Sequence, residues 1–126
     1  MVNGLVDTAI VIDLIRGFPD AHEWLAQRED KLGVTDYVWL EVIQGAQNKQ
    51  KQKAAIAILS DFQLVETSSE DTRWAVESLI SAKLTHSVDP FDCLIAATSH
   101  RLQIPLYTRN LKHFTPLLEE LAQQPY

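Results

Sequence analysis

Short apolar segments alternate with longer helical segments along the whole chain, and this alternation limits the possible folds more than any other feature. The apolar segments have the length of β-strands and lie at residues 4–7, 31–35, 63–66 and 104–108. Strands that alternate with helices are typical of a parallel sheet whose strands are joined by right-handed helical crossovers. We therefore predict an α/β fold with a central, mainly parallel sheet of four to five short strands, formed by residues 1–126 as a single domain.

Local start and stop signals place helices between these segments. The helical patterns cover residues 8–15, 19–29, 36–45, 54–62, 68–83 and a segment that begins at Pro90. Gly17 is a good C-cap for the first helix, and Ser68 with Asp71 forms a capping box. The polar run 47–53 is predicted to be a basic turn, and residues 116–123 a last helix followed by a tail. The expected inner face of the helix over 68–83 consists of Trp74, Leu79, Ile80 and Ala82.

The composition excludes several classes of protein. With 46% hydrophobic and 22% charged residues, the chain resembles an ordinary globular domain. A single cysteine, Cys93, excludes an internal disulfide and fits a reducing cytoplasm. No apolar run approaches the ~20 residues of a membrane helix, and Asp7 and Asp13 interrupt the apolar N-terminus, so neither a membrane span nor a signal peptide is expected. The net charge of −6 argues against a large, non-specific nucleic-acid surface, but it fits a nuclease whose carboxylates bind divalent cations.

Two acidic residues stand out by their positions in the predicted elements. Asp7 ends the first strand where a helix begins, so it is either the N-cap of that helix or an acid at the ligand-binding edge of the sheet. Glu41 lies between Leu40 and Val42 in the apolar helix over 36–45. A carboxylate is costly to bury there unless it is paired or binds a metal, and the alternative is exposure at the boundary of a helix face.

A second pair of acids opens the helix at Pro90. Because a residue before proline avoids the α conformation, Asp89 is expected to be the N-cap and Asp92 the third helical residue. Asp92 then either stabilises the positive helix end or contributes to a site. If Asp7, Glu41 and Asp92 converge, their charges raise one another's pKa values, and a hard cation such as Mg²⁺ would relieve the repulsion. Such an ion would also activate water against a phosphodiester.

Four segments together resemble the PIN-domain nucleases, and within them the VapC-like toxins of bacterial toxin–antitoxin pairs. The segments are residues 5–8 (LVDT), 40–41 (LE), 90–98 (PFDCLIAAT) and 106–114 (LYTRNLKHF). They occur in family order with family-like spacing and extend over residues 4–114. Each segment alone is weakly specific, whereas the two later segments, after an early Asp and a mid-chain Glu, are fairly specific.

The resemblance implies an α/β/α sandwich and a Mg²⁺- or Mn²⁺-dependent endoribonuclease. Its usual targets would be tRNA or rRNA, cleaved to leave a 5′-phosphate and a 3′-hydroxyl. The implied metal ligands are Asp7, Glu41 and Asp92, with Asp89 as a further carboxylate. The other implied site residues are Asn110 in the catalytic pocket, Thr8 and Thr108 as supporting groups, and Arg109, Lys112 and Arg16 as RNA contacts. The implied partners are RNA, a small antitoxin that covers the active-site groove, and a second copy of the chain in a homodimer.

Two positions depart from the family pattern. Many members place a fourth acid in the turn after the last matched strand, where this chain has Asn110 and no acid before Glu119. A neutral amide binds a second Mg²⁺ less firmly, so a two-metal mechanism is in doubt, although Asp89 is an available substitute. Many relatives also end in a short edge strand, whereas residues 116–123 have a helical pattern here, which predicts a sheet that is one strand shorter or is completed differently.

Other interpretations of the same residues stay open. A receiver-type signalling domain also has an acidic Mg²⁺ pocket, although the mid-chain strand here ends at Glu66 instead of an Asp. A PIN fold that has lost catalysis and only binds a partner is a second alternative. Among the basic residues, Arg16 and Arg101 also fit ordinary surface charges, and His113 fits packing in the turn.

Overall fold

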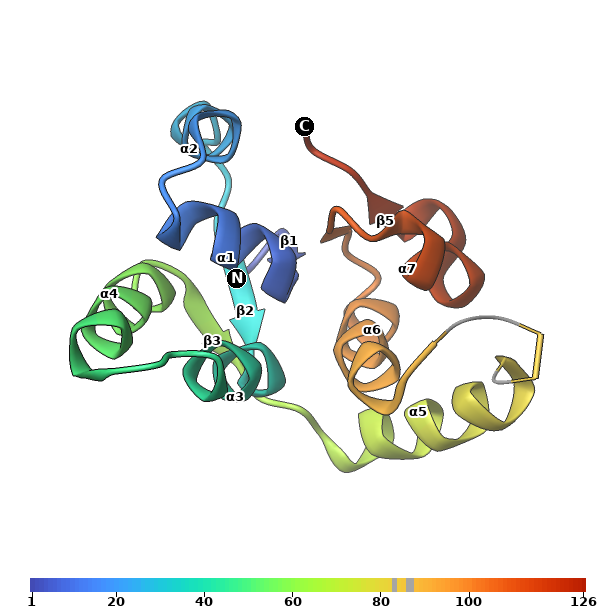
Figure 1. The fold of residues 1–126 in the computed structure, drawn as a ribbon. Coiled ribbons are helices and arrows are strands. Elements are labelled where there is room, and N and C mark those ends of the chain that lie inside the picture. The colour runs from blue at the N-terminus through green and yellow to red at the C-terminus, as the bar shows by residue number, and fades with distance from the viewer. Residues whose placement is uncertain (83, 86–87) are drawn as a thin grey trace.

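The computed structural model describes residues 1–82, 84–85 and 88–126, and it has the predicted α/β arrangement (Figure 1). In this part of the chain, five strands form one parallel sheet in the order β3-β2-β1-β4-β5. Their bounds are β1 Gly4–Val6, β2 Leu32–Thr35, β3 Gln63–Val65, β4 Leu106–Tyr107 and β5 Ala122–Gln123. A receiver-type domain would have the order β2-β1-β3-β4-β5, so the receiver alternative is wrong.

The order of the strands agrees with their burial. Every residue of β1, β2 and β4 is buried, and these three strands occupy the middle of the sheet. β3 and β5 form the two edges, and each has at least one exposed residue. Strands that are covered on both faces need nearly continuous apolar sequences, which GLV and LGVT provide.

The helices form two groups. Their bounds are α1 Thr8–Ile15, α2 Pro19–Ala26, α3 Asp36–Gln44, α4 Lys49–Leu59, α5 Ser69–Ala82, α6 Pro90–Leu102 and α7 Leu111–Leu118. Helix α1 contacts α2, α3 and α4, while α5, α6 and α7 contact one another, and a contact between α3 and α6 joins the two groups. Figure 1 shows the first group, blue to green, on the left and the second, yellow to red, on the right. Among the described residues, no helix combines the length and the apolar character needed to cross a membrane.

The predicted caps are confirmed. The Asp71 N–H donates to Ser68 Oγ at 3.1 Å and the Ser68 N–H donates to Asp71 Oδ2 at 3.0 Å, which is the capping box. Asp89 caps α6, because its Oδ1 accepts from the Asp92 N–H at 2.8 Å. Gly17 follows α1 with a φ of 73°, in the left-handed region that glycine tolerates best.

Three predicted helix boundaries are wrong. The polar run 47–53 is not a turn, since Asn48 Oδ1 accepts from the Lys51 N–H and starts α4 at Lys49. That helix ends at Leu59, short of residue 62. Helix α2 ends at Ala26, three residues before the predicted end, and its last turn closes with the Gln27 N–H shared between the Glu23 and Trp24 carbonyls.

The C-terminal prediction is also wrong. Residues 116–123 are not one helix, because α7 ends at Leu118 and Glu119 has a φ of 52°. A short 3-10 helix, Glu119–Leu121, then leads into β5, which pairs in parallel with β4. The sheet therefore has its fifth strand, and pairing of the backbone with β4 outweighs the helical preference of the local sequence.

The inner face of α5 differs from the prediction at one position. Ile80 is 74% exposed, whereas Asp71, Ala75 and Ala82 are the buried residues of this helix. Their spacing of four and seven residues defines the face that packs inward, and Ile80 is not on it. The predicted end of this helix near Lys83 lies outside the described residues.

We expect Gly33→Ala to destabilise the fold by about 1–3 kcal/mol. An added Cβ at Gly33 would lie 2.9 Å from Val2 Cγ1 and 3.0 Å from the backbone oxygen of Gln63, which cannot move without shifting β3. Urea unfolding at pH 7 measures the change. Gly45→Ala is the control, since its nearest contacts would be 3.6 Å away and its φ is −77°, and it should equal or exceed the natural stability. A Gly33→Ala protein as stable as the natural one would show that β2 and β3 separate easily.

Candidate active site

Asp7 and Thr108 meet where β1 and β4 end. β1 lies between β2 and β4, at the point where the strand order reverses, and open α/β sheets bind ligands at such points. The Thr108 hydroxyl donates to Asp7 Oδ2 at 2.8 Å and accepts the Asn110 N–H at 2.9 Å. Asp7 occupies the N-cap position of α1, but its side chain makes no capping hydrogen bond. Capping therefore does not explain this carboxylate.

Glu41 reaches the same region from α3. The hydroxyl of Thr8, the first residue of α1, donates to Glu41 Oε1 at 2.8 Å. Glu41 is half-buried, so it is not a fully exposed residue at a face boundary. Because Thr8 directly follows Asp7, this hydrogen bond links Glu41 to the end of β1.

Asp92 projects from the first turn of α6, beside α7. Its side chain is 16% exposed, and His113 Nδ1 of α7 lies 3.3 Å from Asp92 Oδ2. This oxygen is buried and, among the described residues, has no hydrogen-bond partner. The His113 contact is an ion pair only when the imidazole is protonated, and it lacks hydrogen-bond geometry. A buried carboxylate oxygen without a donor is costly unless another group binds it.

All three carboxylates have raised pKa values, and burial is the largest cause in each case. Burial raises the pKa of Asp7 to about 6, and the charges of Asp92 and Glu41 add to the rise. Hydrogen bonds from the Thr108 hydroxyl and the Thr8 N–H act in the opposite direction. Burial likewise raises the pKa of Glu41, against the Thr8 hydroxyl.

The pKa of Asp92 is also raised, first by burial and then by the charge of Asp89, with a smaller contribution from Glu41. The charge of His113 and a hydrogen bond from the Asp89 backbone lower the pKa of Asp92 and so oppose this rise. Asp89 itself is exposed and also raises the pKa of Glu41. The four acids therefore interact electrostatically, with Asp89 as the exposed member, while their role as one site stays a prediction.

The residues fit a hard divalent cation by their chemistry. All the candidate donors are carboxylate oxygens, the type that Mg²⁺ and Mn²⁺ prefer, and the buried Asp92 Oδ2 is an unsatisfied acceptor. Among residues 1–82, 84–85 and 88–126, no three such side chains already stand as a complete ligand set. Asp7 and Glu41 instead accept hydrogen bonds from Thr108 and Thr8, so binding an ion would require their side chains to move.

The predicted basic residues do not all lie at this site. Arg16 follows α1 at the end opposite Asp7, about 13 Å along the helix axis. Arg109 directly follows Thr108, but its Nη1 donates to Asp13 Oδ2 at 3.1 Å and its guanidinium lies over the rings of Phe18 and Tyr126. Lys112 and Asn110 are exposed at the start of α7, near the site.

Comparison with known proteins places this site in a family. The profile of the PIN domain matches residues 4–115, which is most of the chain. The chain belongs to the PIN domain family. Ribonuclease VapC19 of Mycobacterium tuberculosis is 28% identical to this PIN domain, over 97% of this chain and 98% of the relative. Ribonuclease VapC10 of the same species is also 28% identical, over 93% of this chain and 89% of the relative.

Solved structures share the fold of this PIN domain along nearly its whole length. A toxin–antitoxin complex from Klebsiella pneumoniae has a TM-score of 0.81 at 28% identity, and covers 98% of both chains. VapBC2 from Rickettsia felis, bound to a DNA fragment from its promoter, has a TM-score of 0.85 at 20% identity, again over 98% of both chains. The second likeness supports the fold, including the fifth strand at the edge beside β4.

Sequence reasoning undervalued His113 in this PIN domain. The sequence analysis treated this histidine as a packing residue of the turn, whereas its Nδ1 lies 3.3 Å from Asp92 Oδ2 and a positive charge on the imidazole lowers the pKa of Asp92. The signal was its spacing: Asn110 is the N-cap of α7, so His113 lies in the first turn of a helix that packs against α6.

Proposed function

We propose that this PIN domain is a divalent-metal-dependent endoribonuclease of the VapC-like toxin type. The observation that supports it most is the convergence of Asp7, Glu41 and Asp92 from three separate elements at the reversal point of the sheet. The curated relatives that it resembles are named ribonucleases, which favours RNA over other phosphodiesters.

In this proposal, Asp7, Glu41 and Asp92 hold one Mg²⁺ or Mn²⁺, and exposed Asp89 lies at the rim. When bound, such an ion stabilises the charge that develops on the phosphodiester and lowers the pKa of water. Thr108 and Thr8 orient the carboxylates of Asp7 and Glu41 through the hydrogen bonds described above. Asn110 is a neutral amide donor at the pocket, so a site for a second ion is not part of the proposal.

In this proposal, His113 has a defined task while no ion is bound. A protonated imidazole 3.3 Å from Asp92 compensates part of the carboxylate charge, and a bound divalent ion would replace that compensation. The exposed Lys112 beside it would contact the RNA backbone, which needs positive charge rather than base recognition. Arg109 would contact the RNA backbone only after its hydrogen bond to Asp13 breaks. Arg16 lies at the far end of α1, too distant to contact a phosphate bound at the carboxylates.

We further propose that the chain binds a small antitoxin and forms a homodimer. The antitoxin is supported by structural neighbours that are toxin–antitoxin complexes, the Klebsiella pneumoniae one at 28% identity. The homodimer and the choice between tRNA and rRNA rest on the family resemblance. An inactive PIN domain that only binds its partner would share this fold, and the assay below separates the two.

The test is RNA cleavage by the purified protein. With Mg²⁺ or Mn²⁺ we expect discrete cleavage of tRNA or rRNA carrying new 5′-phosphates, and EDTA should abolish it. Asp92→Asn should lower the rate by on the order of 10³-fold, because it removes an ion ligand worth several kcal/mol. Rates and product ends are measured on gels and by ligation-dependent sequencing.

Asp61→Asn is the matched control for this assay. Asp61 is exposed in the turn before β3, at the opposite edge of the sheet, so this variant loses the same charge without touching the pocket. It should cleave at the natural rate. Equal cleavage by Asp92→Asn, or cleavage that survives EDTA, would sink the nuclease proposal. Intact RNA with a normal antitoxin complex would favour the inactive binding domain.

A further inference from the structure

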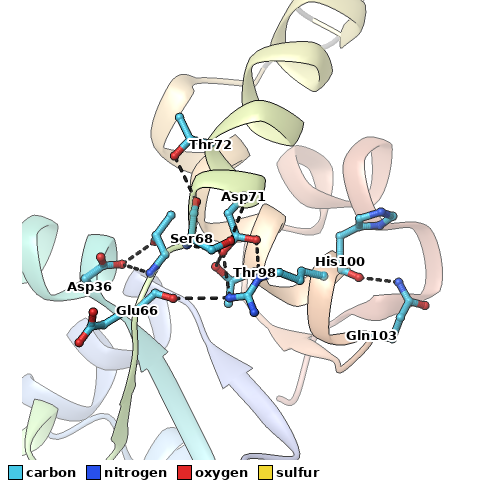
Figure 2. A network of polar contacts seen from close by, with 10 residues as sticks. Asp36, Glu66, Ser68, Asp71, Thr72, Thr98, His100 and Gln103 are labelled. Carbon is cyan, nitrogen blue, oxygen red and sulfur yellow. Dashed lines mark hydrogen bonds and ion pairs between the residues drawn. The ribbon is translucent and has the colours of Figure 1, made fainter.

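A dense network of side-chain hydrogen bonds surrounds Asp71, away from the carboxylate pocket formed by Asp7, Glu41 and Asp92. Figure 2 shows Asp71 within this network, and its side chain is 1% exposed. The Arg101 guanidinium grips both carboxylate oxygens, with Nε donating to Oδ1 at 2.7 Å and Nη2 to Oδ2 at 3.1 Å. The Thr98 hydroxyl donates to Oδ2 at 2.9 Å, as does the Ser68 N–H at 3.0 Å. Burial opposes ionisation, yet these donors hold the pKa of Asp71 below its ordinary value.

The network also reaches α3, through the segment that joins β3 to α5. Arg101 Nη2 donates to the backbone oxygen of Glu66 at 3.5 Å, and Ser68 is two residues further along. Between them, Thr67 donates to Asp36 Oδ1 from its hydroxyl at 2.5 Å and from its N–H at 3.2 Å. Figure 2 shows Asp36 on one side of this segment and Asp71 with Thr98 on the other.

This arrangement ties together the two helices that carry candidate ligands. Asp36 is the first residue of α3 and precedes Glu41 by about 7.5 Å along the helix axis. Thr98 follows Asp92 by about 9 Å along α6. A helix behaves as a rigid rod over such lengths, so a restraint on these residues also restrains the distance between Glu41 and Asp92.

The pocket needs such a restraint, because its own charges oppose it. The Glu41 and Asp92 carboxylates repel, and the direct contact between the first turns of α3 and α6 includes a tilted pair of rings, Tyr37 and Phe91, with centroids 5.9 Å apart. Apolar packing of this kind permits sliding, whereas a two-pronged guanidinium–carboxylate grip has a fixed direction. Because a buried ion pair adds little stability over apolar packing, we attribute the Arg101–Asp71 pair to the fixed geometry that it imposes.

We propose that the Asp71 network, consisting of Asp36, Thr67, Ser68, Asp71, Thr98 and Arg101, positions α3 against α6 and so sets the affinity of the pocket for a divalent cation. None of these residues touches the pocket carboxylates in the hydrogen bonds described above, so they are positioning residues and not catalytic ones. This inference rests on the proposed function in one respect, namely that Glu41 and Asp92 share an ion.

The first test measures Mn²⁺ affinity by calorimetry, without RNA. Arg101→Gln should weaken Mn²⁺ binding at least 10-fold, and Arg101→Lys, which keeps the charge but loses the second prong, should fall between it and the natural protein. Thr67→Val removes only the hydrogen bond from the Thr67 hydroxyl to Asp36, and it should also weaken Mn²⁺ binding. This variant replaces Arg101→Gln in the test if Arg101→Gln does not fold. All titrations are run at 10 °C on proteins whose near-ultraviolet circular dichroism is native.

The matched control is Arg73→Gln. Arg73 is exposed on α5, the helix that carries Asp71, so this variant removes a positive charge without breaking the network and should bind Mn²⁺ with the natural affinity. If Arg101→Gln and Thr67→Val lower the melting temperature but keep the natural Mn²⁺ affinity, the network only stabilises the fold and the inference is overturned.

A second measurement does not depend on the metal. Spin labels at Leu40→Cys on α3 and His100→Cys on α6 report the spacing of the two helices by pulsed electron resonance, since both positions are exposed. The native Cys93 is buried with its thiol pKa raised to about 11, so it should not be labelled. Arg101→Gln should broaden the distance distribution, and an unchanged distribution would overturn the inference. If the natural protein binds no Mn²⁺, the proposed function fails, and the spin-label result still decides this inference.

Discussion

Asp7→Asn should make the metal-free protein more stable than the natural one at pH 7.5, while it abolishes RNA cleavage. Asp7 is 3% exposed, and its pKa rises from 3.8 to about 6 in the folded protein. The folded state therefore holds its proton more tightly than the unfolded chain, and stability is lost as the pH rises from about 4 to 6. A shift of this size corresponds to roughly 3 kcal/mol at pH 7.5. Asparagine avoids this cost and still offers an oxygen to the Thr108 hydroxyl.

Urea unfolding in EDTA at several pH values measures this effect. The stability gap between Asp7→Asn and the natural protein should be near zero at pH 4, open between pH 4 and 6, and stay constant above. Asp61→Asn, an exposed acid, should show no such gap. A variant that is less stable than the natural protein at pH 7.5 would show that the buried charge of Asp7 is compensated.

Divalent cations should reverse the order of the two proteins. An ion that binds only the folded state stabilises it in proportion to the logarithm of its concentration over its dissociation constant. At a thousandfold excess this amounts to about 4.1 kcal/mol, which exceeds the cost of the buried Asp7 charge. Mn²⁺ should therefore raise the melting temperature of the natural protein and leave that of Asp7→Asn nearly unchanged. The buried charge of Asp7 thus both lowers the stability of the metal-free protein and enables the site to bind an ion.

Local rules predicted the parts of this fold that depend on neighbouring residues. The capping box at Ser68, the cap at Asp89 and the glycine after α1 each follow from conformational preferences that act over a few positions. The central strands were predictable because continuous apolar runs are required when both faces of a strand are covered. The convergence of Asp7, Glu41 and Asp92 followed from the same topology, with the family resemblance selecting these three among the 17 acids.

Contacts between distant residues were not predictable. β5 has two residues in a segment of helix-forming amino acids, and only its pairing with β4 makes it a strand. The sequence marks Asp71 as a capping residue, yet most of its hydrogen bonds come from Arg101 and Thr98, about thirty residues away. The hydroxyl of Thr8 bonds to Glu41 across 33 positions. One sequence contains no signal for such pairs.

Asp71→Asn should be the most destabilising substitution of an acid in the described part of the chain, costing about 2–4 kcal/mol at pH 7. The substitution removes the negative charge that faces Arg101. Because the Arg101 side chain is 27% exposed, hydration of its guanidinium offsets part of the lost free energy. Asp30→Asn is the matched control, because the Arg28–Asp30 pair has the same two-pronged contact but side chains 25% and 29% exposed, so it should cost less than about 1 kcal/mol.

The pH dependence should be opposite to that of Asp7. The pKa of Asp71 is lowered in the folded protein, so its contribution is complete above the unfolded pKa near 4 and is lost only as the pH falls through the folded value. The gap between Asp71→Asn and the natural protein should stay constant from pH 7.5 to 5, whereas the Asp7 gap already narrows between pH 6 and 5. A gap that closes between pH 6 and 5 would contradict the assignment of Asp71 as an ionised, fully paired carboxylate. The two buried aspartates are thus expected to differ in the effect of their charge: that of Asp71 is paired and holds its neighbours in place, whereas that of Asp7 has no ion-pair partner and reduces stability until an ion binds.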